Sequence, residues 1–90
     1  MLDPQKLSRD KEEKVREGIY LSRAEHTLSG KIRRLSDRAK KGAKIDAAYL
    51  GRLRNDLKKV VQKRAGVTRE IRHMTAMQSR LKRELARRRR

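Results

Sequence analysis

Apolar residues recur at alternating steps of three and four through the second half of the chain. Between residues 50 and 85, nine of the eleven positions reached by these steps are apolar, and the exceptions are Arg64 and Gln78. Steps that average about 3.5 residues are typical of a helix that keeps one row of side chains, here called the seam, against a partner helix. The pattern therefore predicts a long coiled-coil-type helix over about 47–87.

The first half of the chain carries a weaker seam of the same period. Its positions are Leu21, Glu25, Leu28, Ile32, Leu35 and Ala39, with a continuation towards the start through Gly18, Lys14, Lys11 and Leu7. Asp3 followed by Pro4 is a helix start signal, because the Asp side chain accepts a hydrogen bond from a free backbone N–H and proline at the first position loses none. Gly42 fits the left-handed position that ends a helix. These features predict a first helix over about 4–41.

A loop of only five residues, 42–46, separates the two predicted helices. Asp46 is placed to cap the second helix, and Ile45 is expected to pack on Leu50. A short loop between two long helices makes them antiparallel neighbours, each about 60 Å long at about 1.5 Å per residue. The predicted fold is all-α, a single coiled-coil-like helical hairpin over residues 1–90.

The polar interruptions of the two seams fall opposite each other when the hairpin is folded at about residue 44. Arg64 then lies beside Glu25, and Gln78 lies beside Lys11. The same register pairs Leu28 with Val60, Leu21 with Val67, Gly18 with Ile71 and Leu7 with Leu81. Because two independent patterns agree, we expect Arg64 and Glu25 to set the register as an ion pair. An arginine that extends to solvent is the alternative.

Five residues with apolar character lie off both seams, and a lone hairpin does not account for them: Val15, Ile19, Tyr20, Val61 and Met77. Apolar surface of this kind is typical of a contact with another protein. Two interpretations follow, a homodimer that forms a four-helix bundle or a separate partner protein.

The charge of the chain indicates the chemical class of its main partner. There are 28 Lys and Arg against 11 Asp and Glu in 90 residues, which leaves a net charge of +17. So strong an excess of positive charge favours a polyanion, with nucleic acid the first candidate and an anionic membrane the second. The chain has no cysteine, which excludes disulfides and thiolate metal sites and suits a reducing compartment.

The outward positions of the second helix hold seven basic residues and no acid. We call them the outer face: Arg52, Lys58, Lys59, Arg69, Arg72, Arg80 and Arg83. The acids Asp56, Glu70 and Glu84 flank the seam instead, where we expect them to pair with Lys or Arg of the first helix. An ordinary solvated helix face mixes both signs of charge, whereas Arg69 and Arg72 repel each other. The arrangement favours a polyanion partner for the outer face.

Both ends of the hairpin add further positive charge. Residues 31–44 contain seven basic residues and one acid, and the candidate contacts there, the loop-end cluster, are Arg33, Arg34, Arg38, Lys40, Lys41 and Lys44. The chain closes with an arginine run, Arg87, Arg88, Arg89 and Arg90, which we interpret as a tail that overruns its partner helix and has no helical reason to be ordered. A flexible phosphate clamp is the favoured role, with a nuclear-localisation-like patch or a solubilising end as alternatives.

These features predict a non-enzymatic protein that binds the phosphate backbone of structured RNA or duplex DNA. Tyr20 and Tyr49 are too few to stack on bases, and no zinc or helix-turn-helix motif is present. The alternative function is a coiled-coil rod or adaptor that docks on an acidic protein surface. A membrane is disfavoured because the outer face lacks large apolar side chains.

Catalysis finds no support in the sequence. His26 and His73 lie far apart, with no carboxylate or cysteine cluster at ligand spacing, so no metal, cofactor or small-molecule substrate is expected. No apolar run reaches about 10 residues, well below a membrane span of about 20 residues or a signal peptide. We expect a cytoplasmic protein.

Overall fold

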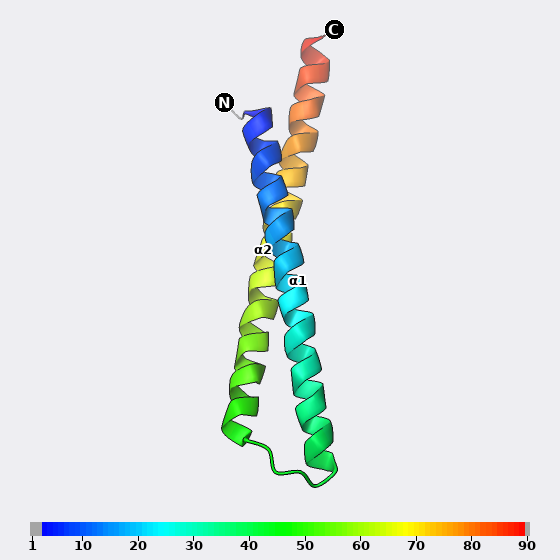
Figure 1. Ribbon diagram of the computed structural model, residues 1–90. Coiled ribbons are helices and arrows are strands. Elements are labelled where there is room, and N and C mark those ends of the chain that lie inside the picture. The colour runs from blue at the N-terminus through cyan, green and yellow to red at the C-terminus, as the bar shows by residue number, and fades with distance from the viewer. Residues whose placement is uncertain (1–2, 90) are drawn as a thin grey trace.

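The structure is a rod made of two antiparallel helices (Figure 1). The computed structural model describes residues 3–89. Helix α1 spans Pro4–Lys40 and helix α2 spans Ala47–Arg88. The rod measures 72 × 18 × 14 Å. The all-α hairpin that the two seams predict is confirmed, and each predicted helix boundary differs from the observed one by at most one residue.

The expected N-caps are formed by aspartate side chains. Asp3 Oδ1 accepts a hydrogen bond of 3.0 Å from the N–H of Gln5. Asp46 Oδ1 accepts hydrogen bonds from the N–H groups of Ala48 at 3.0 Å and Tyr49 at 3.2 Å. Each cap therefore satisfies backbone donors that have no partner inside the helix.

The end of α1 depends on Gly42, as predicted. Gly42 has a φ of +87°, a backbone conformation that residues with a Cβ adopt only at a cost in free energy. Its N–H donates to the carbonyl of Ala39 at 3.1 Å, and the N–H of Ala43 donates to the carbonyl of Arg38 at 3.0 Å. These two hydrogen bonds form a Schellman motif, which turns the chain out of α1.

The core is a single row of aliphatic side chains between the helices. The buried members all occupy predicted seam positions: Leu7, Leu21, Leu50, Leu53 and Val67. Leu85 also belongs to the predicted seam but is 44% exposed. The difference arises because α1 begins at Pro4, so little of α1 remains opposite the last turns of α2.

Polar contacts across the seam confirm the predicted register. Arg64 Nη1 lies 2.9 Å from Glu25 Oε2, and Lys11 Nζ donates a hydrogen bond of 3.0 Å to Gln78 Oε1. Glu25 Oε2 is screened from solvent and has no well-aligned hydrogen-bond donor among residues 3–89, so its contact with Arg64 is chiefly electrostatic. The interruptions of the two seams are thus paired with each other.

Gly18 lies against the facing helix, close to Val67. A Cβ placed on Gly18 would lie 3.6 Å from Cγ1 of Val67, and Gly18 lines the same groove as Ile71, its predicted partner. Val67, which is buried, therefore packs beside Gly18 of α1.

Candidate nucleic-acid interface

The outer face of α2 is fully open to solvent. All seven of its basic residues are exposed along the length of the helix. None of the seven makes an ion pair with another residue of the segment 3–89. Their charges are therefore uncompensated within the described chain, which is the electrostatic condition for binding a polyanion.

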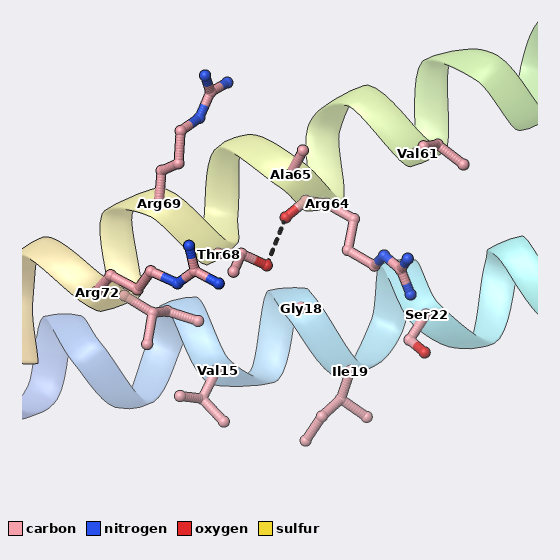
Figure 2. A pocket seen from close by; sticks show the side chains of 11 residues that line it. Val15, Gly18, Ile19, Ser22, Val61, Arg64, Ala65, Thr68, Arg69 and Arg72 are labelled. Carbon is pink, nitrogen blue, oxygen red and sulfur yellow. Dashed lines mark hydrogen bonds between the residues drawn. The ribbon is translucent and has the colours of Figure 1, made fainter.

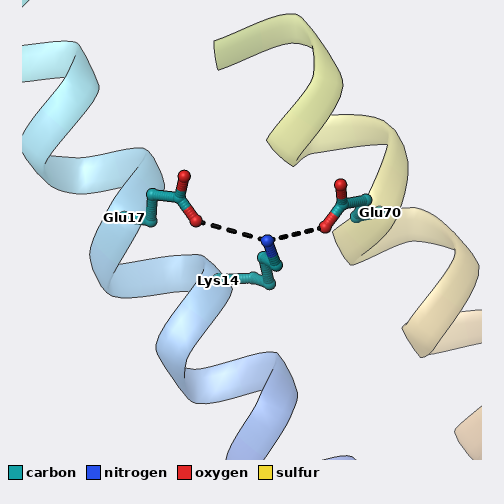
Figure 3. Close-up of polar contacts among 3 residues, drawn as sticks. All are labelled: Lys14, Glu17 and Glu70. Atoms are coloured by element: carbon teal, nitrogen blue, oxygen red, sulfur yellow. Dashed lines mark hydrogen bonds and ion pairs between the residues drawn. The ribbon is translucent and has the colours of Figure 1, made fainter. Parts of the chain in front are cut away.

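Of the acids that flank the seam, Glu70 forms an ion pair with α1. Glu70 lies 2.9 Å from Lys14 Nζ, and Glu17 lies 3.4 Å from the same nitrogen (Figure 3). The Glu70 carboxylate, followed by that of Glu17, raises the pKa of Lys14 above its ordinary value of 10.5. The predicted pairing of a flanking acid with α1 is confirmed for Glu70.

The same prediction is wrong for Asp56 and Glu84. Neither residue makes an ion pair within the part of the chain that the structure describes. Glu84 lies near the level at which α1 begins, so it has little of that helix opposite it. Asp56 lies in the part of α2 nearer the loop, one turn after the buried Leu53. These two carboxylates add negative charge to the flank and none to the outer face.

The loop-end cluster is also exposed, and the structure adds an aromatic neighbour to it. All six of its candidate residues are exposed. Arg34 and Arg38, one turn apart on α1, line a shallow cavity of about 200 Å³ together with Lys31, Leu35 and Tyr49. Tyr49 is 43% exposed. The turn thus brings basic side chains and one aromatic ring together at one end of the rod.

The arginine run does not form a separate tail at its start. Helix α2 continues through Arg88, and Arg89 is its C-cap. Arg88, which was predicted to lie in the tail beyond the helix, belongs to the helix instead, because arginine is a good helix former and nothing in the run breaks a helix. Arg90 lies outside the described residues. The described part of the run, residues 87–89, projects beyond the start of α1 (Figure 1).

The rod separates the candidate residues into three exposed sets. The loop-end cluster occupies one end and the arginine run the other, and the outer face joins them along α2. The structure therefore does not gather these residues into one compact site. It places them along a line 72 Å long, which suits an extended ligand.

The pattern of seams did not predict the groove shown in Figure 2. It has a volume of about 690 Å³ and lies on the flank of the rod, where its aliphatic side chains are Val15, Ile19, Val61 and Ile71. Ser22 and Thr68 line it from the two helices. A signal for this flank exists in the sequence, because Val15, Ile19 and Val61 are three of the five apolar residues that lie off both seams.

Comparison of the chain with known proteins found no matching family, no matching curated protein and no matching solved structure. Within residues 3–89, neither α1 nor α2 has an apolar stretch of the length that crosses a bilayer. The same residues contain no group of three His, Asp or Glu side chains placed to hold a metal ion.

Proposed function

We propose that this chain binds nucleic acid through phosphate contacts along the outer face of α2, the loop-end cluster and the arginine run. The observation that carries the proposal is that seven basic residues of the outer face are exposed and have no ion-pair partner among residues 3–89. Phosphate groups supply the counter-charge, and release of their condensed counterions supplies much of the binding free energy.

The shape of the rod favours a helical ligand over a single strand. About 21 base pairs of B-form duplex span about 71 Å, which matches the length of the rod. Tyr49, near the start of α2, is the one aromatic residue of this helix, so the exposed basic residues along it recognise shape and backbone rather than base edges. The proposed ligand is duplex DNA or structured RNA in a reducing compartment such as the cytoplasm.

The first experiment is a titration of nuclease-treated protein against a duplex of about 21 base pairs, as DNA and as RNA. The logarithm of the affinity should fall linearly with the logarithm of the salt concentration, with a slope of about −0.9 for each phosphate neutralised on B-form DNA. Absence of binding at low salt, or affinity that persists at high salt, contradicts the proposal.

A pair of matched variants locates the contact surface. The outer-face variant replaces four exposed residues of α2 by glutamine: Lys59, Arg69, Arg80 and Arg83. The α1 variant replaces four exposed basic residues of α1 by glutamine: Lys6, Arg9, Arg16 and Arg23. Both variants have the same net charge. The outer-face variant should reduce the magnitude of the salt slope by about 3–4, whereas the α1 variant should change it by less than about 1. Equal losses would show that only net charge matters.

A second candidate function is a rod that docks on an acidic protein surface. The observation that favours it is exposed apolar surface on α1, where Tyr20 is 72% exposed and Ile19 is 50% exposed. Such residues are typical of protein contacts. Protein purified without nuclease treatment separates the candidates, because bound nucleic acid supports the first function and a co-purifying acidic protein supports the second.

A further inference from the structure

The groove on the flank of the rod lacks a partner within the described chain. Val15, Ile19 and Val61 line it and are 40%, 50% and 39% exposed (Figure 2). Branched aliphatic side chains are ordinarily buried. Phosphate groups do not remove such side chains from water, so nucleic-acid binding does not account for this surface.

The total surface of the chain indicates how much area a partner could cover. The chain exposes 7841 Å², whereas a compact monomer of 10.6 kDa exposes roughly 5,500 Å². The excess of about 2,300 Å² exceeds the roughly 800 Å² that each partner contributes to an interface of standard size. A two-helix rod therefore has ample surface for a second layer of helices.

Contacts between α1 and α2 show which residues share a level along the rod. The residue numbers of contacting pairs add to 84 for Lys14 and Glu70 and to 89 for Glu25 and Arg64. Any two residues of α1 and α2 whose numbers add to a value in this range therefore lie at about the same height.

Two such level pairs beside the groove are complementary in size or charge. Ile19 is level with Ala65, and both line the groove. Glu12 is level with Arg72, which also lines the groove, while Glu12 lines an adjoining cavity that shares Val15. One pair thus combines a large with a small side chain, and the other combines an acid with a base.

We propose that two copies of this chain associate through the groove, about a two-fold axis parallel to the rod, to form a four-helix bundle. This rotation keeps every residue at its level and lays α1 of one copy over α2 of the other. Ile19 then packs over Ala65 of the partner subunit, and Glu12 lies beside Arg72 of the partner subunit. The symmetry makes each contact twice.

The second copy is favoured over a helix of another protein because this chain supplies both members of each complementary pair. The arrangement also divides the basic residues of α2 between two roles. Arg72 moves to the interface between subunits and Arg69 also lines the groove, whereas Lys59, Arg80 and Arg83 lie outside the groove and stay available for phosphate. The dimer thus presents two outer faces on opposite sides of the bundle.

The first test is sedimentation velocity of the nucleic-acid-free full chain in about 1 M NaCl, where a Debye length of about 3 Å screens repulsion between the two copies. The wild type should sediment as a dimer. Ala65→Arg, which occupies the space under Ile19 of the partner subunit, should be monomeric, and so should Ile19→Ser. Ala76→Arg adds the same charge at an exposed position outside the groove and should remain dimeric.

A wild type that stays monomeric up to about 0.1 mM, well above a micromolar dissociation constant, overturns the proposal and leaves the groove to a helix of another protein. Dimerisation of Ala65→Arg and Ile19→Ser at wild-type affinity overturns it as well. Circular dichroism should show equal helicity for all variants. Because the samples contain no nucleic acid, the result is independent of the function proposed above.

The second test is a charge swap, measured at about 0.15 M salt, where the Debye length is about 8 Å. Glu12→Arg and Arg72→Glu should each raise the dimer dissociation constant about five- to tenfold, because each weakens two contacts per dimer. The double variant restores the pair and should return to within about threefold of wild type.

Arg23→Glu is the matched control for the charge swap. It changes the net charge as Arg72→Glu does, at an exposed position of α1 outside the groove, and should not raise the dissociation constant. A double variant as weak as the single variants contradicts the proposed axis, since Glu12 then has no basic partner at the level of Arg72.

Discussion

Replacement of Gly18 by alanine is expected to stabilise the protein, and the structure sets the size of the gain. Glycine inside a helix costs about 1 kcal/mol relative to alanine. The new Cβ would lie 3.6 Å from Cγ1 of Val67, an ordinary van der Waals distance, so the methyl group fits without displacing its neighbour. Val67 is only 5% exposed, and partial burial of the methyl adds a few tenths of the roughly 0.8 kcal/mol of a fully buried CH₂.

The expected total is about 1.3 kcal/mol, which corresponds to a rise of about 5–10 °C in the midpoint of thermal unfolding for a chain of this size. Thermal and urea unfolding followed by circular dichroism measure it, at one fixed protein concentration. Gly66→Ala is the matched control, because a Cβ there meets nothing within 4 Å and gains only helix propensity. A smaller gain for Gly18→Ala than for Gly66→Ala would refute the packing that the structure shows.

Three further variants test the hairpin. Arg64→Met leaves the carboxylate of Glu25, whose side chain is 24% exposed, without its cation. Arg64→Met should lower the free energy of unfolding in urea by about 1 kcal/mol. The double variant with Glu25→Leu should recover that loss, because no unpaired carboxylate remains. A double variant that is no more stable than Arg64→Met contradicts this reasoning. Gly42→Ala must adopt a φ of +87° and should lose about 1–2 kcal/mol, with a smaller loss for Gly42→Asn; equal losses would show that conformation is not the cause. The pKa of Lys14 is raised above 10.5 in the folded state. The stabilisation that protonated Lys14 gives is therefore complete below pH 10.5 and is lost as the pH rises through the pKa of Lys14 in the folded state. The stability difference from Lys14→Met should therefore shrink in alkaline urea unfolding, and a difference independent of pH contradicts the interpretation.

Most of the hairpin could be predicted from the sequence because its determinants are local. Asp3, Asp46 and Gly42 act on backbone groups within a few residues of themselves, so their roles follow from position in the chain. The seam has a period that only one secondary structure satisfies. The register followed as well, since the polar interruptions at Arg64 and Gln78 each found a polar partner on α1.

The flanks of the rod were predicted less well, because they depend on the distance between the helices. The acids Asp56, Glu70 and Glu84 occupy equivalent positions in the repeat, yet only Glu70 pairs with α1 within the described residues. A repeat gives each of these residues the same direction around α2. It does not give the separation of the two helices at each level, and that separation decides whether side chains meet.

The sequence by itself determined the two helices, their caps, their antiparallel pairing and the acid-free row of basic residues on α2. Each of these follows from spacing along one chain or from the alignment of two short patterns. Only the tertiary structure decided that Lys14 pairs with Glu70, and that Val15, Ile19 and Val61 frame a groove. The physical reason is that a groove or an ion pair between helices requires side chains from both to reach one point in space, which depends on packing as well as on period.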